Sequence, residues 1–341
     1  DDDTAVCSIN KGDDQPLRLE VPPLLGHALA ELLLKKIDRP RGRTGTWQEG
    51  FLDETIAGKR QVALVRVAST DAGEIITLSF IDPDLGEPDN LFTPEQRKTV
   101  VDALDTRTGL VGVSGPTLGS TITVLHALEE LLKEYATPQH VQLATSFGMD
   151  THAALQNTLH RLPPFVLTAL PEDAVSNPDT WRALTQAAIA GSVIVVGVPG
   201  HDTASLVRLL HSQTPSFLWK PLFQLTIVHA PFPSACPSCA IPMPVHPDVI
   251  EQFARDADSA LLHGLKSAHA PGCEACDFHG RGPAVGAVEL CTPDLVPEDF
   301  DALDLGPALR QRGMKTIIDD LVRRSYHTPM PLTRAARLWR G

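Results

Sequence analysis

The sequence predicts an α/β protein in which a small mixed α+β domain precedes a mostly parallel sheet covered by helices. Three observations support this prediction. Apolar, strand-like runs alternate with helical segments from residue 94 to residue 211. A β-hairpin pattern comes before this region, and two C-x-x-C pairs follow it. The length of 341 residues, with 43% apolar residues, is sufficient for two domains and a small third module.

The N-terminal part, residues 1–90, is expected to form the small mixed domain. Leu24 to Ile37 is a helix candidate. Two strands follow, one around residues 62–67 with alternating apolar faces and one over residues 75–81, and the polar turn at residues 69–73 joins them as a hairpin.

Residues 91–230 are expected to form the central α/β domain. Thr93, Pro94 and Gln96 form a capping-box pattern that starts a helix ending near Leu104. The strand Leu110–Ser114 comes next and leads through a glycine-bearing turn into the helix 122–135. The later elements are predicted as strand 141–145, helix 150–162, strand 165–170, helix 178–190, strand 193–198 and helix 203–211.

The turn after the strand Leu110–Ser114 is the candidate ligand site, because glycine-bearing strand-to-helix turns can bind phosphate. Residues 115–122 read GPTLGSTI. Compared with the phosphate-loop pattern, Gly115 fits, whereas Ser120, Thr121 and Ile122 replace the second glycine, the lysine and the magnesium-binding hydroxyl. The next basic residue, Lys133, lies twelve positions beyond Thr121, roughly 18 Å along a helix, and cannot replace the lost ammonium.

Four cysteines in the C-terminal part, residues 231–341, form a candidate metal site. Cys236 and Cys239 make one C-x-x-C pair, Cys273 and Cys276 make another, and 33 residues separate the pairs. Four thiolates suit tetrahedral zinc, and four protein ligands leave no position for a reactive water, so we expect a structural site. A pair of disulfides is the alternative, favoured only in an exported protein.

Charge and hydropathy exclude other classes of protein. The net charge of −13 argues against general binding to nucleic acid or acidic lipid. The longest apolar stretch, Val193–Val198, is much shorter than the roughly 20 residues of a membrane helix, and no signal peptide is visible. The segment 306–341 is basic, with eight lysines and arginines against two aspartates, and is either a solvated helix face or a docking surface for an acidic neighbour.

Several segments together resemble one known family. Residues 115–127, GPTLGSTITVLHA, are similar to GPTGSGKTTTLYA, and the hairpin segments Val65–Ser69 and Gly73–Leu78 stand in the order of R-x-S and GE-x-x-x-L-R-x-L. The cysteine module followed by Phe278–Glu289 is similar to a tetracysteine module followed by GYxGRxGxxE. These segments are typical of the assembly ATPases of type II secretion and type IV pili, which the chain resembles over roughly residues 24–338.

The resemblance implies a RecA-like P-loop core followed by a zinc module and C-terminal helices. It also implies a hexamer at the cytoplasmic face of the inner membrane, bound to an integral membrane platform protein. For Arg66 the resemblance implies an inter-subunit role, and a salt bridge at the strand edge is the alternative. The nucleotide-binding positions would be those of the degenerate loop: Gly115, Pro116, Thr117, Gly119, Ser120 and Thr121.

The family's acidic boxes are also replaced. Residues 144–147 read ATSF where the family has VEDP, and Leu170 stands where the glutamate of GEIRD belongs. Phosphoryl transfer depends on a cation, a magnesium ion and acidic groups, so we expect a degenerate member that does not hydrolyse ATP, without ATP and magnesium as firm cofactors and with no catalytic residue of its own.

Three functions remain open from the sequence. The first is a silent homologue that pairs with an active ATPase or the platform protein as a scaffold or regulator of the machine. The second is a working ATPase whose missing groups come from a neighbouring subunit. The third is a zinc-containing docking module without a nucleotide role.

Overall fold

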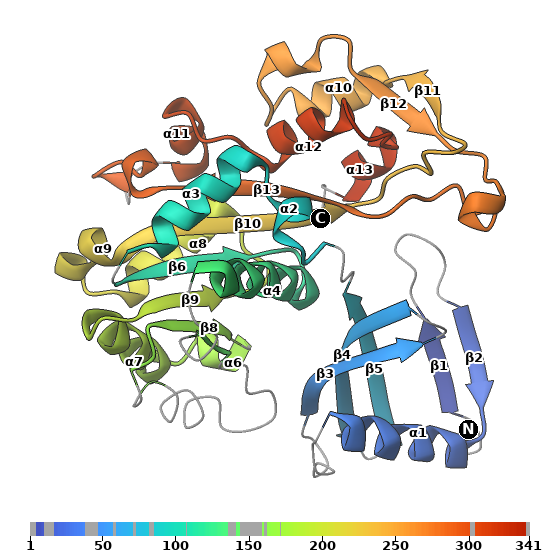
Figure 1. The fold of residues 1–341 in the computed structure, drawn as a ribbon, viewed down its shortest axis with the longest axis horizontal. Helices are drawn as coiled ribbons and strands as arrows, with labels where there is room; N and C mark the ends of the chain where they lie inside the picture. Colours follow the sequence, from blue (N-terminus) through green and yellow to red (C-terminus); the bar gives the residue numbers. More distant parts are fainter. Residues whose placement is uncertain are drawn as a thin grey trace. The chain divides into compact units, whose positions relative to one another are not determined.

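A computed structural model of the chain describes residues 5–9, 17–37, 47–56, 59–70, 73–81, 85–106, 108–135, 141–143, 159, 162–170, 172–300 and 304–338. The described residues form two compact units, one within residues 1–81 and the other within residues 82–341 (Figure 1). None of the helices in these ranges is both long enough and apolar enough to cross a membrane.

The first unit contains a helix packed on an antiparallel sheet. Strands β3 (Trp47–Ile56), β4 (Lys59–Thr70) and β5 (Gly73–Ile81) pair in that order, so the predicted hairpin is confirmed. Helix α1 (Pro23–Lys36) buries Leu33 and Leu34 against Val65 and Val67 of β4. A separate two-stranded sheet consists of β1 (Ala5–Ile9) and β2 (Leu17–Val21).

The second unit is built on a six-stranded sheet with the order β13-β10-β6-β9-β8-β7. All neighbouring strands are parallel except β13, which is antiparallel to β10, so the prediction of a mostly parallel sheet is confirmed. The strands are β6 (Gly109–Ser114), β7 (Val141–Leu143), β8 (Phe165–Ala169), β9 (Val193–Gly197), β10 (Phe223–Phe232) and β13 (Val285–Cys291).

Helices cover both faces of this sheet, and two glycines mark where they approach most closely. A Cβ at Gly112 would lie 2.7 Å from a methyl group of Leu210 in helix α8 (Thr203–Gln213). A Cβ at Gly197 would lie 2.7 Å from Thr121 in helix α4 (Leu118–Tyr135). Gly197 pairs in register with Val113, the neighbour of Gly112, so α4 and α8 lie on opposite faces, because successive residues of a strand point to opposite sides.

The remaining helices of the core follow the predicted signals. Helix α3 (Pro94–Leu104) has the expected capping box between Thr93 and Gln96. Helix α7 (Pro178–Ile189) begins after the N-cap Asn177, and Gly191 follows its end with φ of 112°. The shorter helices are α2 (Pro88–Leu91), α6 (Glu172–Val175) and α9 (Ser216–Leu222).

The C-terminal residues add short elements beyond β10, and one of them bonds the edge strand β13 at Val288. The carboxylate of Asp320 accepts a hydrogen bond from the Val288 amide at 2.9 Å and pairs with Arg324 at 2.9 Å. The elements are β11 (Ile241–Pro244), α10 (Pro247–Phe253), η2 (Ser259–Leu262), β12 (Lys266–His269), η3 (Glu274–Cys276), η4 (Pro293–Leu295), α11 (Leu305–Gln311), α12 (Ile317–Ser325) and α13 (Leu332–Leu338).

Some predicted boundaries differ from the structure or lie outside the described residues. Helix α4 begins at Leu118, four residues before the predicted start at Ile122, because Thr117 caps a helix that already includes the glycine-bearing segment. The predicted helix 150–162 lies almost wholly outside the described residues, as do the last two residues of the predicted strand 141–145. The domain limits near residues 90 and 230 remain predictions.

Candidate functional site

The predicted phosphate loop lies at the carboxyl end of β6, a central strand of the parallel sheet. This is the edge at which ligands usually bind in open α/β sheets. The carbonyl oxygen of Gly115 accepts a hydrogen bond from the Gly200 amide at 2.7 Å, and the Ser114 hydroxyl accepts one from the His201 amide at 3.0 Å. The turn after β6 is therefore bonded to the turn after the neighbouring strand β9.

Thr117 accepts hydrogen bonds from backbone amides at the start of α4 that could otherwise bind a ligand. Its hydroxyl oxygen accepts a hydrogen bond from the Ser120 amide at 3.1 Å, and its carbonyl oxygen accepts one from the Thr121 amide at 3.1 Å. In a phosphate loop, backbone N–H groups of this segment point at the phosphates. Here at least two of them are bonded within the chain, and only residues 115–117 remain outside regular structure.

The side chains at the second half of the motif are directed into the protein. Ser120 and Thr121 are buried, with relative exposures of 5% and 0%, whereas Pro116 and Thr117 are exposed. The hydroxyl of Ser120 lies 3.0 Å from that of Thr117, and the hydroxyl of Thr121 donates to the Thr117 carbonyl at 3.2 Å. Gly119, which lies between Thr117 and Ser120 in the sequence, is partly exposed. The position of the family lysine is therefore a packed core position.

His229 of β10 lies behind the loop, and sequence analysis did not single it out. Its Nδ1 donates to the carbonyl oxygen of Ser120 at 3.3 Å, and its Nε2 has no hydrogen-bond partner among the described residues. Burial lowers the pKa of His229 to about 4, against the smaller opposing effect of the Ser120 carbonyl, while the nearby Arg324 lowers it further. This imidazole is neutral near pH 7 and supplies no positive charge to the loop.

The other groups expected to act on a nucleotide are either apolar or lie outside the description. Leu170, at the position of a family glutamate, is fully buried after β8. Residues 144–147 and the side chains of Glu172 and Asp173 are outside the described part of the chain. The same holds for the side chain of Arg66, whose backbone lies in β4 opposite Glu49 and Thr77.

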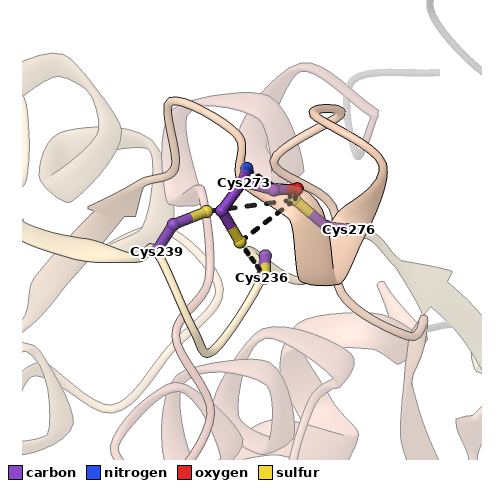
Figure 2. Close-up of side chains that lie close together, drawn as sticks. All are labelled: Cys236, Cys239, Cys273 and Cys276. Carbon is purple, nitrogen blue, oxygen red and sulfur yellow. Dashed lines mark hydrogen bonds between the residues drawn. The ribbon is translucent and has the colours of Figure 1, made fainter.

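The four predicted metal ligands come together in one cluster, although the two pairs are far apart in the sequence (Figure 2). The Sγ atoms of Cys236 and Cys273 are 3.9 Å apart, those of Cys239 and Cys276 are 4.0 Å apart, and those of Cys273 and Cys276 are 3.8 Å apart. A regular tetrahedron with metal–sulfur bonds of about 2.3 Å has sulfur–sulfur distances of about 3.8 Å. The cluster therefore fits a tetrahedral metal ion.

The distances do not fit the alternative of two disulfides, whose sulfur atoms would lie about 2.05 Å apart. Each C-x-x-C pair closes a turn, with the second amide bonded to the first carbonyl at 3.2 Å in Cys236–Cys239 and at 3.1 Å in Cys273–Cys276. The amides of Cys273 and Gly280 both donate to the Cys276 sulfur at 3.2 Å. Such N–H groups stabilise a thiolate, as a metal site requires.

The thiols differ in acidity for identifiable reasons. The hydrogen bond from the Cys273 amide, assisted by that from Gly280, lowers the pKa of Cys276 to about 7, although desolvation opposes this. Desolvation raises the pKa of Cys239 to about 12. A bound cation would favour the thiolate form of both. Cys291 is buried in β13 and is not part of the cluster, and burial raises its pKa to about 12.

Close backbone packing holds the second pair in place. Gly272 has φ of 103°, and a Cβ there would lie 2.4 Å from the Phe278 carbonyl oxygen. Gly280 has φ of 67°, and a Cβ there would lie 2.2 Å from the Ala270 carbonyl oxygen. The amide of Cys236 donates to the carbonyl of Gly280 at 3.0 Å, so the segment after the second pair also positions the first.

Comparison with known proteins shows that the sequence is similar to that of a pilus assembly ATPase and that the fold is similar to that of a bacterial ATPase. The chain is 23% identical over 280 residues to the type IV pilus assembly ATPase PilB of Acinetobacter baylyi. This match covers 72% of this chain and 47% of that protein. The chain thus spans about half the length of this curated relative. No protein-family model matches the chain.

Among solved structures, the Legionella pneumophila ATPase DotB superposes with a TM-score of 0.51 at 14% identity, covering 86% of this chain and 77% of DotB. The pilus retraction motor PilT with bound ADP has a TM-score of 0.46 at 12% identity, covering 95% of this chain and 82% of PilT. The likeness to DotB supports the predicted RecA-like fold.

Proposed function

We propose that this chain, which is related to the ATPases of type IV pili and secretion machines, does not hydrolyse ATP and acts as a scaffold or regulator of such a machine. The relationship suggests the kind of machine, and the geometry at the start of α4 supports the absence of ATP hydrolysis. Thr117 bonds the amides of Ser120 and Thr121 within the chain, and Thr121 is buried where the motif needs a lysine.

The missing groups all act on the transition state of phosphoryl transfer. That step depends on a cation at the transferred phosphate, a magnesium ion and nearby acids. Removing one electrostatic element of this kind commonly lowers the rate by about 10²–10³-fold. Residues 115–132 contain no lysine or arginine, and Leu170 replaces an acid, so several such losses combine in this chain.

The cysteine cluster serves the scaffold as a structural zinc site in this proposal. Four sulfur ligands satisfy a tetrahedral ion completely and leave no position for a water molecule, which excludes a hydrolytic zinc centre of the usual open kind. The two pairs enclose residues 240–272, which contain β11, α10 and β12, so the ion would close this insert at its base.

The proposed partners are an active homologous ATPase or the membrane platform protein of the same machine, at the cytoplasmic face of the inner membrane. In such an assembly the chain would occupy the place of a motor subunit or bind beside one. We propose no nucleic acid partner, in keeping with the net charge of −13.

Calorimetric titration with ATP and magnesium, combined with a phosphate-release assay, tests this function. We expect no saturable binding in the micromolar range and no release above background. Turnover of one per second or more that disappears in the variant Thr117→Val would contradict the proposal, since loss in that variant excludes a contaminating ATPase. Oligomerisation that requires ATP, measured by sedimentation velocity, would instead support a working ATPase completed by neighbouring subunits.

A further inference from the structure

A cavity of about 320 Å³ opens beside β13, between α3 and the segment that leads into α12. Its volume lies at the lower end of the roughly 300–1,000 Å³ found for ligand pockets. The lining combines apolar side chains, among them Leu290, Leu295 and Met314, with threonines and charged groups. None of these residues belongs to the turn at residues 115–117 or to the cysteine cluster.

The floor of this cavity is a stretch of sheet edge that the protein leaves open. At Val288, the amide is bonded to Asp320 at 2.9 Å and the carbonyl oxygen accepts from the side chain of Gln96 at 3.3 Å. Leu290, two residues further along β13, presents its N–H and C=O to the same side, because these directions alternate along an antiparallel strand. Among the described residues, no side chain is bonded to the Leu290 backbone as Asp320 and Gln96 are to Val288.

Two cations of the basic C-terminal segment, residues 306–341, lie at this cavity. Three arginines of the segment are bonded to other groups of the chain: Arg310 pairs with Asp256, Arg312 donates to the Asp294 carbonyl and Arg324 pairs with Asp320. In contrast, Lys315 and Arg323 are exposed at the wall of the cavity.

Neither Lys315 nor Arg323 forms an ion pair within the described part of the chain. Glu95 also lines the cavity, while the Asp320 carboxylate is already paired with Arg324. The available charge therefore favours an acidic ligand.

We propose that this cavity binds an extended, acidic peptide segment of a partner protein, which adds a short strand to β13 at Leu290. The N–H and C=O of Leu290 would pair with the peptide backbone, and one acidic side chain would lie between Lys315 and Arg323. A free anion could use the cations but would leave the Leu290 carbonyl without a donor, whereas a peptide backbone supplies both a donor and an acceptor. The apolar lining offers contacts for an alternate side chain of the same strand.

Fluorescence anisotropy with a labelled peptide of sequence VTVDVEV and the full chain tests this site. We expect saturable binding below 1 mM, weakened roughly tenfold for the peptide VTVNVQV and for the variant Lys315→Glu/Arg323→Glu. The variant Arg255→Glu, which changes an exposed cation just after the end of α10, is the control and should bind as the wild type does. Two further peptides carry methyl groups on the backbone nitrogens of alternate residues, each along one edge of the extended chain. Methylation along the edge that pairs with β13 should abolish binding, and methylation along the other edge should not.

Other outcomes overturn the proposal. Absence of binding at 2 mM peptide, or equal binding by the double charge variant, would exclude an acidic peptide site. Equal tolerance of methylation on both edges would exclude strand addition, and displacement by millimolar phosphate would assign the site to free anions. Self-association of the chain that the double variant abolishes would show that a second copy is the ligand. None of these results depends on whether the chain binds ATP, so this site and the proposed function can fail separately.

Discussion

Thr121 of α4 packs against Gly197 of β9 so closely that a Cβ on the glycine would lie 2.7 Å from the Thr121 methyl group. The hydroxyl of Thr121 donates to the Thr117 carbonyl, and the side chain is fully buried. A residue at the lysine position of a phosphate loop would normally extend toward the ligand. In this protein the same position contributes to the contact between α4 and the sheet, and this has consequences for any attempt to restore nucleotide binding.

The variant Thr121→Lys is expected to destabilise the protein and not to restore ATP binding. An ammonium group without a counter-charge in this packed position costs on the order of 3 kcal/mol of unfolding free energy. Urea unfolding measures the loss, and calorimetry with ATP and magnesium measures binding. The control Thr121→Val keeps the shape and loses one hydrogen bond, about 1 kcal/mol. A Thr121→Lys protein of wild-type stability that binds ATP would show that the site is still a nucleotide site.

The contact itself can be measured by a pair of small substitutions. Gly197→Ala should lower the unfolding free energy by about 1–3 kcal/mol, because the new methyl group has no room beside Thr121 and lies 3.2 Å from Leu125. In the background Thr121→Ala the same change should cost much less, since the obstructing methyl group is absent. A double-mutant cycle from urea unfolding gives the coupling. Additive effects would mean that the two residues do not constrain each other.

Most of the alternating strands and helices could be predicted from the sequence because the signals for them are local. The capping box at Thr93, the N-cap Asn177 and the glycine after α7 each mark a helix boundary within a few residues. The start of α4 could not be predicted in the same way. A phosphate-loop pattern implies an open loop up to residue 121, but α4 begins at Leu118, four residues before the predicted start, and the Thr117 hydroxyl bonds the helix terminus there.

Long-range pairing is the other feature that the sequence did not reveal. The two cysteine pairs could be matched because thiolates have few other uses in such spacing, and the structure brings all four together. By contrast, β10 and β13 are separated by more than fifty residues and pair in the core sheet, with His229 opposite Val288. No local pattern links two strands at that distance, so neither β13 nor the cavity beside it could be expected.

Zinc should copurify with the protein at one ion per chain and should be essential for the stability of the segment 236–280. Removal with a chelator under reducing, native conditions should release the ion and lower the thermal midpoint, because the metal–sulfur bonds that link the two cysteine pairs would be lost. Elemental analysis and thermal unfolding check this. Cys273→Ser should lose the ion, whereas Cys291→Ala, at a buried cysteine outside the cluster, should retain it. Retention of zinc by Cys273→Ser would contradict the assignment of ligands.

Glu289 should make the protein less stable as the pH rises from about 4.5 to 7. Its carboxyl group is buried and accepts from the Ile317 amide at 3.0 Å, and desolvation raises its pKa to about 7 from an ordinary value of 4.5. The folded state then binds more protons than the unfolded state between these values, so stability is greatest below pH 4.5 and falls by about 3 kcal/mol up to pH 7. Glu289→Gln should remove this slope in urea unfolding from pH 4 to 8. An unchanged slope would mean that the carboxyl group is solvated.

His229 should produce the opposite slope over nearly the same range. Burial lowers its pKa to about 4 from 6.5, so the unfolded state binds more protons between these values, and stability falls as the pH drops from 6.5 to 4. The variant His229→Asn keeps a donor for the Ser120 carbonyl but cannot titrate. Because the two slopes oppose each other, the wild-type curve should be flatter than either variant's. Stability of His229→Asn should rise on acidification toward pH 4.5, whereas that of Glu289→Gln should fall. Two variant curves with slopes of the same sign would show that at least one of these side chains is exposed to water in solution.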